Sequence, residues 1–311
     1  MARAGPQHHP DRGHAEALGR EPPPVFPAGE LDALPPPAMA RKAEEVGQAK
    51  VELEIGRTLA LAVLAGAFIA MGAVFATTVG AGGGGLPYGV ARLLGGLAFS
   101  LGLILVVVAG AELFTGNNLV VMAWASRRVT SVRLLGSWTL VYAGNFVGAI
   151  ATAGLMYATR QYTFGDGAVG QQVLSIAVTK TSLGFGQALA LGILCNALVC
   201  IAVWLTYSAR TTTDRILAVV PPIAAFVASG FEHSVANMYF VPIGLFVATD
   251  ETWLAATPGL PDLGDLTWSS FFLANLLPVT IGNVIGGTLL VGAIYWFVYL
   301  RPARPQGERS A

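Results

Sequence analysis

The sequence predicts an all-α integral membrane protein of six transmembrane helices in an inverted repeat, with spans two and five interrupted. Of its 311 residues, 54% are hydrophobic and only 12% are charged, whereas soluble domains have about 25% charged residues. The mean hydropathy is +0.62. The apolar runs are long enough for membrane helices and too long for the strands of a membrane barrel. A short motif recurs in the two halves of the chain, as described below.

The predicted spans also have a predicted orientation. They are residues 58–80, 89–127 with an interruption, 134–158, 184–208, 216–248 with an interruption, and 270–300. Cytoplasmic loops have an excess of Lys and Arg. One side of the membrane receives most of the basic residues, including Arg41, Lys42, Lys50, Arg127 and Arg215. We therefore expect both termini in the cytoplasm and the chain in the inner (cytoplasmic) cell membrane.

The regions outside the spans have their own predictions. Residues 1–35 are rich in proline, which predicts a disordered cytoplasmic tail; its His8, His9 and His14 could bind a metal, but a solvated tail fits better. Residues 36–57 are predicted to form an amphipathic cytoplasmic helix on the membrane surface, with Arg41 and Lys42 at the lipid headgroups. Residues 58–302 form the six-helix membrane domain, and residues 303–311 the cytoplasmic C-terminal tail.

Two GNxxG segments indicate the inverted repeat. Gly144–Gly148 lies in span three and Gly282–Gly286 in span six. Because these segments are three spans apart, the two halves have opposite topology in the membrane. The GxxxG spacing permits close helix approach. Asn145 and Asn283 either form hydrogen bonds across helices or line a pathway.

Polar residues interrupt the middle span of each half. Glu232 and His233 lie within an otherwise apolar segment, near Gly230. Charged groups at membrane depth cost about 2.5–3.5 kcal/mol on insertion scales, and they are usually functional. In span two, the segment 110–118 reads GAELFTGNN. Irregular backbone is tolerated at this depth only inside protein or beside a water-filled cavity. We therefore expect this loop to enter the protein and present the hydroxyl of Thr115.

Several segments resemble the formate/nitrite transporter family. The most specific is FVASGFEHSVANM at residues 226–238, and others are ELFT (112–115), WTLVYAGNFVG (138–148), LGILCN (191–196) and PVTIGN (278–283). The resemblance covers about residues 36–302. Segments 36–47 and 95–107 resemble the formate channel branch most, whereas segments 110–116 and 179–181 resemble the nitrite branch. The Pro-rich tail lies outside the family pattern.

The resemblance implies an aquaporin-like bundle of six helices, assembled as a homopentamer with one pore per protomer. It implies that His233 is the central pore histidine and Thr115 its partner on the loop of span two. The remaining implied pathway positions are an outer aromatic constriction (Phe99, Phe226), a cytoplasmic constriction (Leu103, Leu113, Phe114), polar residues near the histidine (Asn196, Glu232) and a basic residue of the outer vestibule (Lys180). Glu232 is expected to hold the backbone or Asn196 and not to face the pore.

The expected function is a pH-dependent channel or transporter for formate and related small monovalent anions, with proton donation or relay at His233. No cofactor is expected, and the formal net charge of zero gives no indication of nucleic acid. A nitrite or hydrosulfide channel of the same family is the alternative. A neutral-solute channel is less favoured, because paired Asn-Pro-Ala loops are missing from the sequence.

An intramembrane enzyme is the competing class. Such an enzyme needs a metal cluster or a nucleophile with a base among the spans. His233 is the only histidine in the spans, and Glu112 and Glu232 are essentially the only carboxylates there. Cys195 and Cys200 share one apolar span and lack zinc-ligand spacing, so we interpret them as small core residues. The sequence therefore predicts no enzyme.

Overall fold

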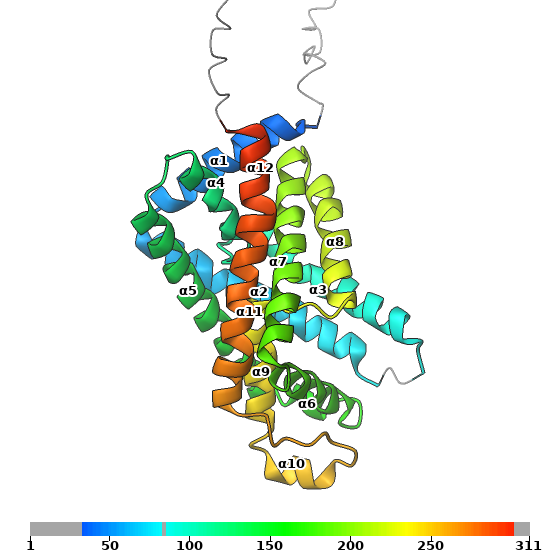
Figure 1. Ribbon diagram of the computed structural model, residues 1–311. Coiled ribbons are helices and arrows are strands. Elements are labelled where there is room, and N and C mark those ends of the chain that lie inside the picture. Colours follow the sequence, from blue (N-terminus) through cyan, green and yellow to red (C-terminus); the bar gives the residue numbers. More distant parts are fainter. Residues whose placement is uncertain (1–32, 83–84, 302–311) are drawn as a thin grey trace, which may run out of the picture. The chain divides into compact units, whose positions relative to one another are not determined.

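A computed structural model describes residues 33–82 and 85–301 (Figure 1), and the described residues from Leu34 onward belong to one unit. Within these ranges the regular structure is helical and contains no strand. The predictions for residues 1–32, including the three tail histidines, and for the C-terminal tail from residue 302 lie outside the described residues.

The first half of the unit contains three long apolar helices. Its elements are α1 (Pro36–Glu52), α2 (Ile55–Gly80), α3 (Tyr88–Ala109), η3 (Gly116–Val120), α4 (Val121–Ala125) and α5 (Ser131–Ala158). Of these, α2, α3 and α5 are long and apolar enough to cross a membrane. The irregular segment between α3 and η3 is the predicted interruption of span two.

The second half repeats this plan. Its elements are η4 (Gln161–Thr163), α6 (Ala168–Thr181), α7 (Phe185–Ser208), α8 (Thr212–Ala228), α9 (Ser234–Val247), α10 (Glu251–Ala256), and a continuous run of η5 (Ser270–Leu276), α11 (Leu277–Ile285), η6 (Gly286–Ala293) and α12 (Ile294–Tyr299). Both α7 and the run Ser270–Tyr299 are long enough to span a membrane. Because α8 and α9 share the remaining crossing, the prediction of six spans with two interrupted is confirmed.

The two breaks have the same backbone geometry. Gly110 ends α3 with φ +81°, and Gly230 follows α8 with φ +74°. After each glycine, the next N–H bonds back to the carbonyl five residues earlier, from Ala111 to Val106 and from Phe231 to Phe226. Glycine adopts this left-handed conformation without steric cost, and such a motif satisfies the last carbonyls of a helix. The two helix ends are therefore closed before the chain turns into the protein.

Glycines allow the helices of each half to touch. A Cβ atom on Gly148 of α5 would collide with the carbonyl oxygen of Val63 on α2. A Cβ on Gly286 would collide in the same way with the carbonyl oxygen of Ile193 on α7. The GxxxG motifs therefore provide close helix contacts, as the sequence predicts.

The shorter helices differ from what the sequence predicts. Residues 168–181, between predicted spans three and four, form α6. The sequence predicted neither this helix nor α10. The predicted surface helix 36–57 ends at Glu52, and α2 begins at Ile55. The apolar face of α1 packs on protein: Met39, Ala40 and Ala43 lie in one buried cluster with Leu119, Met122 and Trp204.

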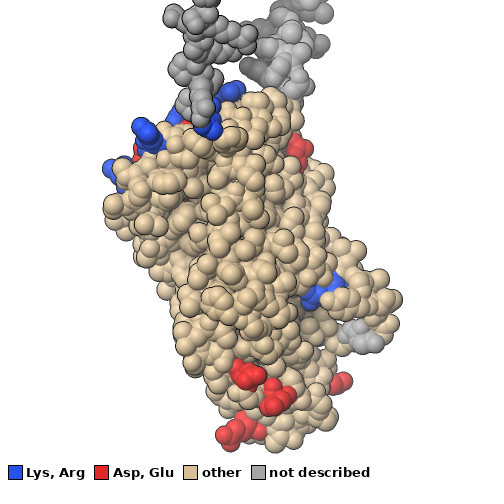
Figure 2. All heavy atoms as spheres, viewed as in Figure 1, with Lys and Arg blue, Asp and Glu red and all other residues tan. Residues whose placement is uncertain are grey.

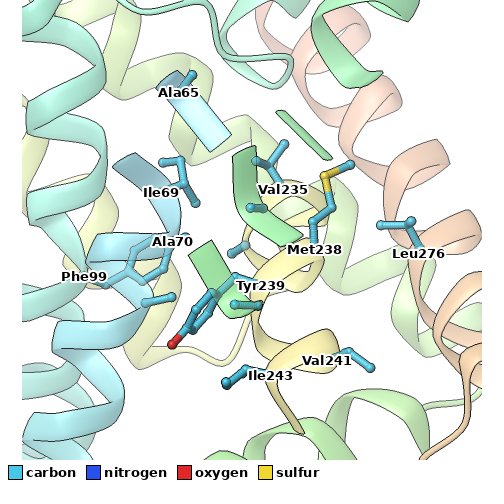
Figure 3. Packing of buried hydrophobic residues seen from close by; sticks show 14 of the residues in the cluster. Ala65, Ile69, Ala70, Phe99, Val235, Met238, Tyr239, Val241, Ile243 and Leu276 are labelled. Carbon is cyan, nitrogen blue, oxygen red and sulfur yellow. The ribbon is translucent and has the colours of Figure 1, made fainter. Parts of the chain in front are cut away.

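The largest buried cluster surrounds the two breaks. It joins residues of α2, α3, α5, α7 and α9. Figure 3 shows Ile69 and Ala70 of α2, Phe99 of α3 and Tyr239 of α9 among its members. The broken loops are therefore held in a packed interior, where their polar groups require partners within the protein.

Candidate functional site

The two broken segments meet at a buried histidine and threonine. Thr115 Oγ1 and His233 Nε2 are 2.9 Å apart. Thr115 is completely buried and His233 is 3% exposed. These residues are 118 positions apart in the chain, so this contact exists only because the two halves fold against each other.

Hydrogen bonds of the imidazole determine its tautomer. His233 is the N-cap of α9, and its Nδ1 accepts a hydrogen bond from the backbone N–H of Ala236 at 3.0 Å. An accepting Nδ1 has no proton, so a neutral imidazole has its proton on Nε2. Nε2 therefore donates to the Thr115 oxygen. The hydroxyl proton of Thr115 is then free to be donated to a third group.

Two asparagines hold the broken loops by the same pattern. In the first half, Asn145 Oδ1 accepts from Phe114 N at 2.9 Å, and its Nδ2 donates to the carbonyl oxygens of Ala62 and Glu112 at 2.8 and 2.9 Å. In the second half, Asn283 Oδ1 accepts from Ser234 N at 2.9 Å. Its Nδ2 donates to the carbonyl oxygens of Gly192 and Glu232 at 2.8 and 2.9 Å. Of the two roles left open for these asparagines, the contacts favour the structural one.

Glu232 forms a buried ion pair with Lys180 of α6. Lys180 Nζ lies 2.8 Å from Glu232 Oε1, and the two side chains are 13% and 7% exposed. The second oxygen, Oε2, accepts from Asn237 at 2.7 Å and from Asn275 at 3.2 Å. The expectation that Glu232 holds the backbone or Asn196 was therefore wrong, because its carboxylate contacts the side chains of Lys180, Asn237 and Asn275.

The first half contains a matching ion pair that the sequence analysis missed. Lys50 Nζ of α1 lies 2.6 Å from Glu112 Oε1, and Asn117 donates to Glu112 Oε2 at 2.7 Å. The signal was present in the sequence, because each glutamate follows its break glycine by two residues and precedes its asparagine by five. From the sequence, Lys50 is interpreted only as one of the basic residues on the cytoplasmic side. Its partner Glu112 cannot be identified from the sequence of α1 alone.

Asn196 of α7 connects the two broken segments. Its Nδ2 lies 3.3 Å from the carbonyl oxygen of Thr115, 2.7 Å from Asn118 Oδ1 and 2.7 Å from the carbonyl oxygen of Asn283. Cys200 Sγ also donates to the Thr115 carbonyl, at 3.3 Å. These contacts fix the backbone of Thr115 and so orient its hydroxyl toward His233.

Aromatic rings lie on one side of the histidine. Phe99 and Phe226 meet edge to face with their ring centres 5.6 Å apart. The Phe226 ring stacks on His233 at 6.0 Å, and Phe240 stacks on Phe99 at 6.2 Å. Phe99 and Phe226 are both buried. The structure thus brings the two residues of the predicted outer constriction together beside His233.

A cavity of about 260 Å³ lies on the other side. Leu103 and Leu113 are part of its wall, as are Lys42 and Lys50 of α1 and Arg215 of α8. Phe114 does not line this cavity. Its ring packs edge-on against Trp138 and Tyr142 of α5, at centre distances of 6.3 and 4.9 Å. The assignment of Phe114 to a cytoplasmic constriction with these leucines is therefore not supported by the geometry.

An inverted repeat of membrane helices whose broken segments meet at a buried polar centre is the architecture of a membrane channel or transporter. Residues 37–297 match the family described as formate/nitrite transporter. The chain belongs to the formate/nitrite transporter family.

Relatives and solved structures agree with this family. The formate channel FocA of Escherichia coli strain K12 is 47% identical over 274 residues, which cover 87% of this chain and 96% of that protein. A probable formate transporter of Methanothermobacter thermautotrophicus is 37% identical over 284 residues, 86% of this chain and 97% of the relative. A solved structure titled pentameric formate channel with formate bound is 44% identical, with a TM-score of 0.75 over 79% of this chain and 98% of that one.

Proposed function

We propose that this chain is a channel for formate and related small monovalent anions, with its pathway running past His233 and Thr115. The observation that supports this most strongly is the 2.9 Å contact between these two side chains at the junction of the broken segments. The relative at 47% identity is named a formate channel, which favours formate over nitrite as the anion that is moved.

Apolar residues on each side of the centre would select the transported species. Phe99 and Phe226 lie on one side, and Leu103 and Leu113 on the other. A bare anion loses its hydration in such surroundings at a large cost, whereas the neutral acid does not. Transport therefore depends on pH, because lower pH increases the fraction of formate present as the neutral acid.

The role of His233 is to act on the substrate through Thr115. Because Nδ1 accepts from Ala236 N–H, the imidazole could become a proton donor only after Nδ1 is protonated and this cap is lost. The Thr115 hydroxyl has no such restriction and is free to donate to a carboxylate oxygen. We therefore favour a neutral hydrogen-bond donor at the centre over the net proton donation expected from the sequence.

The lysines near the breaks would guide the anion only at short range. Lys180 lies 2.8 Å from Glu232, and Lys50 lies 2.6 Å from Glu112. Each pair is neutral overall, so its attraction for an anion falls with distance faster than that of a lone cation. Lys180 Nζ also lies 5.3 Å from the centre of the Phe240 ring, next to the aromatic side of the pathway. We assign it a hydrogen-bonding role at the pathway entrance.

The assembly and orientation are part of the same proposal. One solved relative is titled a pentameric channel, and we propose a homopentamer for this chain. Figure 2 shows most of the visible Lys and Arg side chains at the end of the unit that carries α1, and Asp and Glu side chains grouped near α10. By the positive-inside rule, we place the α1 end and both termini in the cytoplasm and the protein in the inner membrane.

Formate flux into liposomes tests the central pair. Thr115→Ala removes the hydroxyl, and we expect formate flux to fall at least tenfold, since a lost hydrogen bond to a charged group is worth about 1.5–3 kcal/mol. Thr115→Ser retains the hydroxyl and is the matched control. We expect its flux to stay within about threefold of wild type, which corresponds to about 0.7 kcal/mol. Glycerol swelling measured on the same vesicles separates an anion pathway from a neutral-solute channel. Equal formate flux in Thr115→Ala and wild type would remove Thr115 from the mechanism.

A further inference from the structure

The mouth of the 260 Å³ cavity brings together cations from two helices. Lys42 and Lys50 of α1 and Arg215 of α8 all line it. Lys50 is neutralised by Glu112 at 2.6 Å. Lys42 and Arg215 form no ion pair with any residue in the described ranges. Two uncompensated positive charges therefore remain at the cavity mouth.

The protein holds Lys42 in this position by a specific contact. Its Nζ donates to the carbonyl oxygen of Tyr207 at 3.1 Å, near the C-terminal end of α7. Burial, followed by the positive charges of Arg215 and Arg210, lowers the pKa of Lys42 from its usual value. The positive charge of Lys42 is thus kept where neighbouring charges oppose it. An anion between these groups would remove that unfavourable energy.

Asp214, the acidic residue next to Arg215 in the sequence, already caps a helix. Asp214 Oδ2 accepts from the backbone N–H groups of Arg210 and Thr211, and Thr211 Oγ1 accepts from Asp214 N. This is a capping box at the start of α8. Asp214 is therefore held by the helix that it caps, and it forms no ion pair with Lys42.

Apolar side chains form much of the cavity wall. They include Leu103, Val106, Leu113 and Val203. The desolvation cost of an ion rises steeply with its charge, so a divalent anion is stopped where a small monovalent acid continues. The cavity thus combines a cationic group with apolar walls.

We propose that this mouth is a binding site for a free divalent oxyanion, such as inorganic phosphate, held between Lys42 and Arg215. Its consequence for transport rests on the proposed function: an anion bound there occupies the approach to Leu103 and Leu113 and slows formate passage. An anionic lipid headgroup has the same chemistry. The position of these cations in a cavity lined by α1, α3 and α8 favours the free ion.

Calorimetric titration of nanodiscs made from phosphatidylcholine tests binding directly. The probe is inorganic phosphate at pH 8 against a background of chloride at constant ionic strength. We expect saturable binding that is at least tenfold weaker in Lys42→Gln and in Arg215→Gln, as expected for the loss of one charge-assisted hydrogen bond. Arg57→Gln is the matched control and retains binding, because Arg57 is 75% exposed and pairs with Glu54 at 3.3 Å outside the cavity.

Formate efflux from proteoliposomes tests the consequence. With phosphate on both sides, we expect slower wild-type flux, and flux that no longer responds to phosphate in Lys42→Gln. Binding no stronger than that of chloride, or equal binding in both variants and wild type, would overturn the site. Binding that requires phosphatidylglycerol in the nanodisc and ignores phosphate would instead assign it to a lipid and also overturn the proposal. If phosphate binds but wild-type vesicles pass no formate, the proposed channel function fails and the site remains.

Discussion

The two lysine–glutamate pairs allow one prediction to be made with an internal control. Lys180→Met removes the cation from Glu232, whose side chain is 7% exposed, whereas Lys50→Met removes the cation from Glu112, whose side chain is 8% exposed. The glutamates are equally buried, but Lys180 is 13% exposed and Lys50 is 26% exposed. Water can therefore replace Lys50 more easily than Lys180.

The expected magnitudes follow from this difference in access. Removal of one partner from a buried ion pair costs about 3–5 kcal/mol. We expect about 3 kcal/mol for Lys180→Met, at the low end, because Glu232 keeps its bonds from Asn237 and Asn275. For Lys50→Met we expect about 1.5 kcal/mol, the lower value for a hydrogen bond to a charged group. The double variant Lys180→Met with Glu232→Gln leaves no buried charge and should recover more than half of the loss.

Equilibrium unfolding in mixed micelles containing SDS, followed by tryptophan fluorescence, measures these free energies. A double-mutant cycle gives the coupling between Lys180 and Glu232, which we expect to be at least about 2 kcal/mol. Equal losses for the two lysine variants, together with a coupling near zero, would refute the interpretation of Lys180–Glu232 as a buried clamp. Formate flux of the stable double variant then reports the transport role of Lys180 separately from its role in folding.

The remaining predictions concern helix contact, loop support and pH. Gly148→Ala places a Cβ against the Val63 carbonyl and should cost about 1–3 kcal/mol in the same unfolding assay, whereas Gly154→Ala, which meets no atom within 4 Å, should be neutral; equal effects would contradict the close-contact argument. Asn283→Leu leaves buried backbone groups of the second loop without partners and should cost at least about 3 kcal/mol, seen as loss of folded protein in membranes; normal accumulation and flux would show that the loop does not need this support. Two hydrogen bonds lower the pKa of Asp250 below 3.8, first that from Tyr162 and then that from the Trp253 N–H. The contribution of ionised Asp250 to the stability of the fold is therefore present above pH 3.8 and is lost only as the pH falls through the lowered pKa. The pH profile of formate flux between pH 5 and pH 8, a range chosen around the unperturbed pKa of imidazole at about 6.5, should therefore be the same in Asp250→Asn and wild type, and a shifted profile would disprove this.

The positions of the breaks could be predicted because their cause is local. Gly110 and Gly230 interrupt otherwise apolar segments and are followed by acidic and amide side chains. Polar residues at membrane depth require partners, so the sequence already indicates that both segments enter the protein. The GNxxG repeat then indicates the opposite orientation of the two halves.

The shorter helices could not be predicted by the same reasoning. The segment of α6 contains both apolar and polar residues, including Gln171, Gln172 and Lys180, and it has no hydrophobic run of membrane length. Its buried residues Val173 and Leu174 become an apolar face only against the rest of the bundle. The packing of α1 on protein could not be predicted for a similar reason, because its apolar side fits either lipid or protein.

The sequence alone therefore determined the spans, their interruptions, the repeat and the residue types at the centre, since membrane burial limits polar groups strongly at each position. The tertiary structure decided which polar groups meet. It paired Lys180 with Glu232 and Lys50 with Glu112, turned Phe114 toward α5, and directed the Ala236 N–H to His233 Nδ1. Partner choice depends on distances of about 3 Å between segments far apart in the chain, and no local pattern specifies such distances.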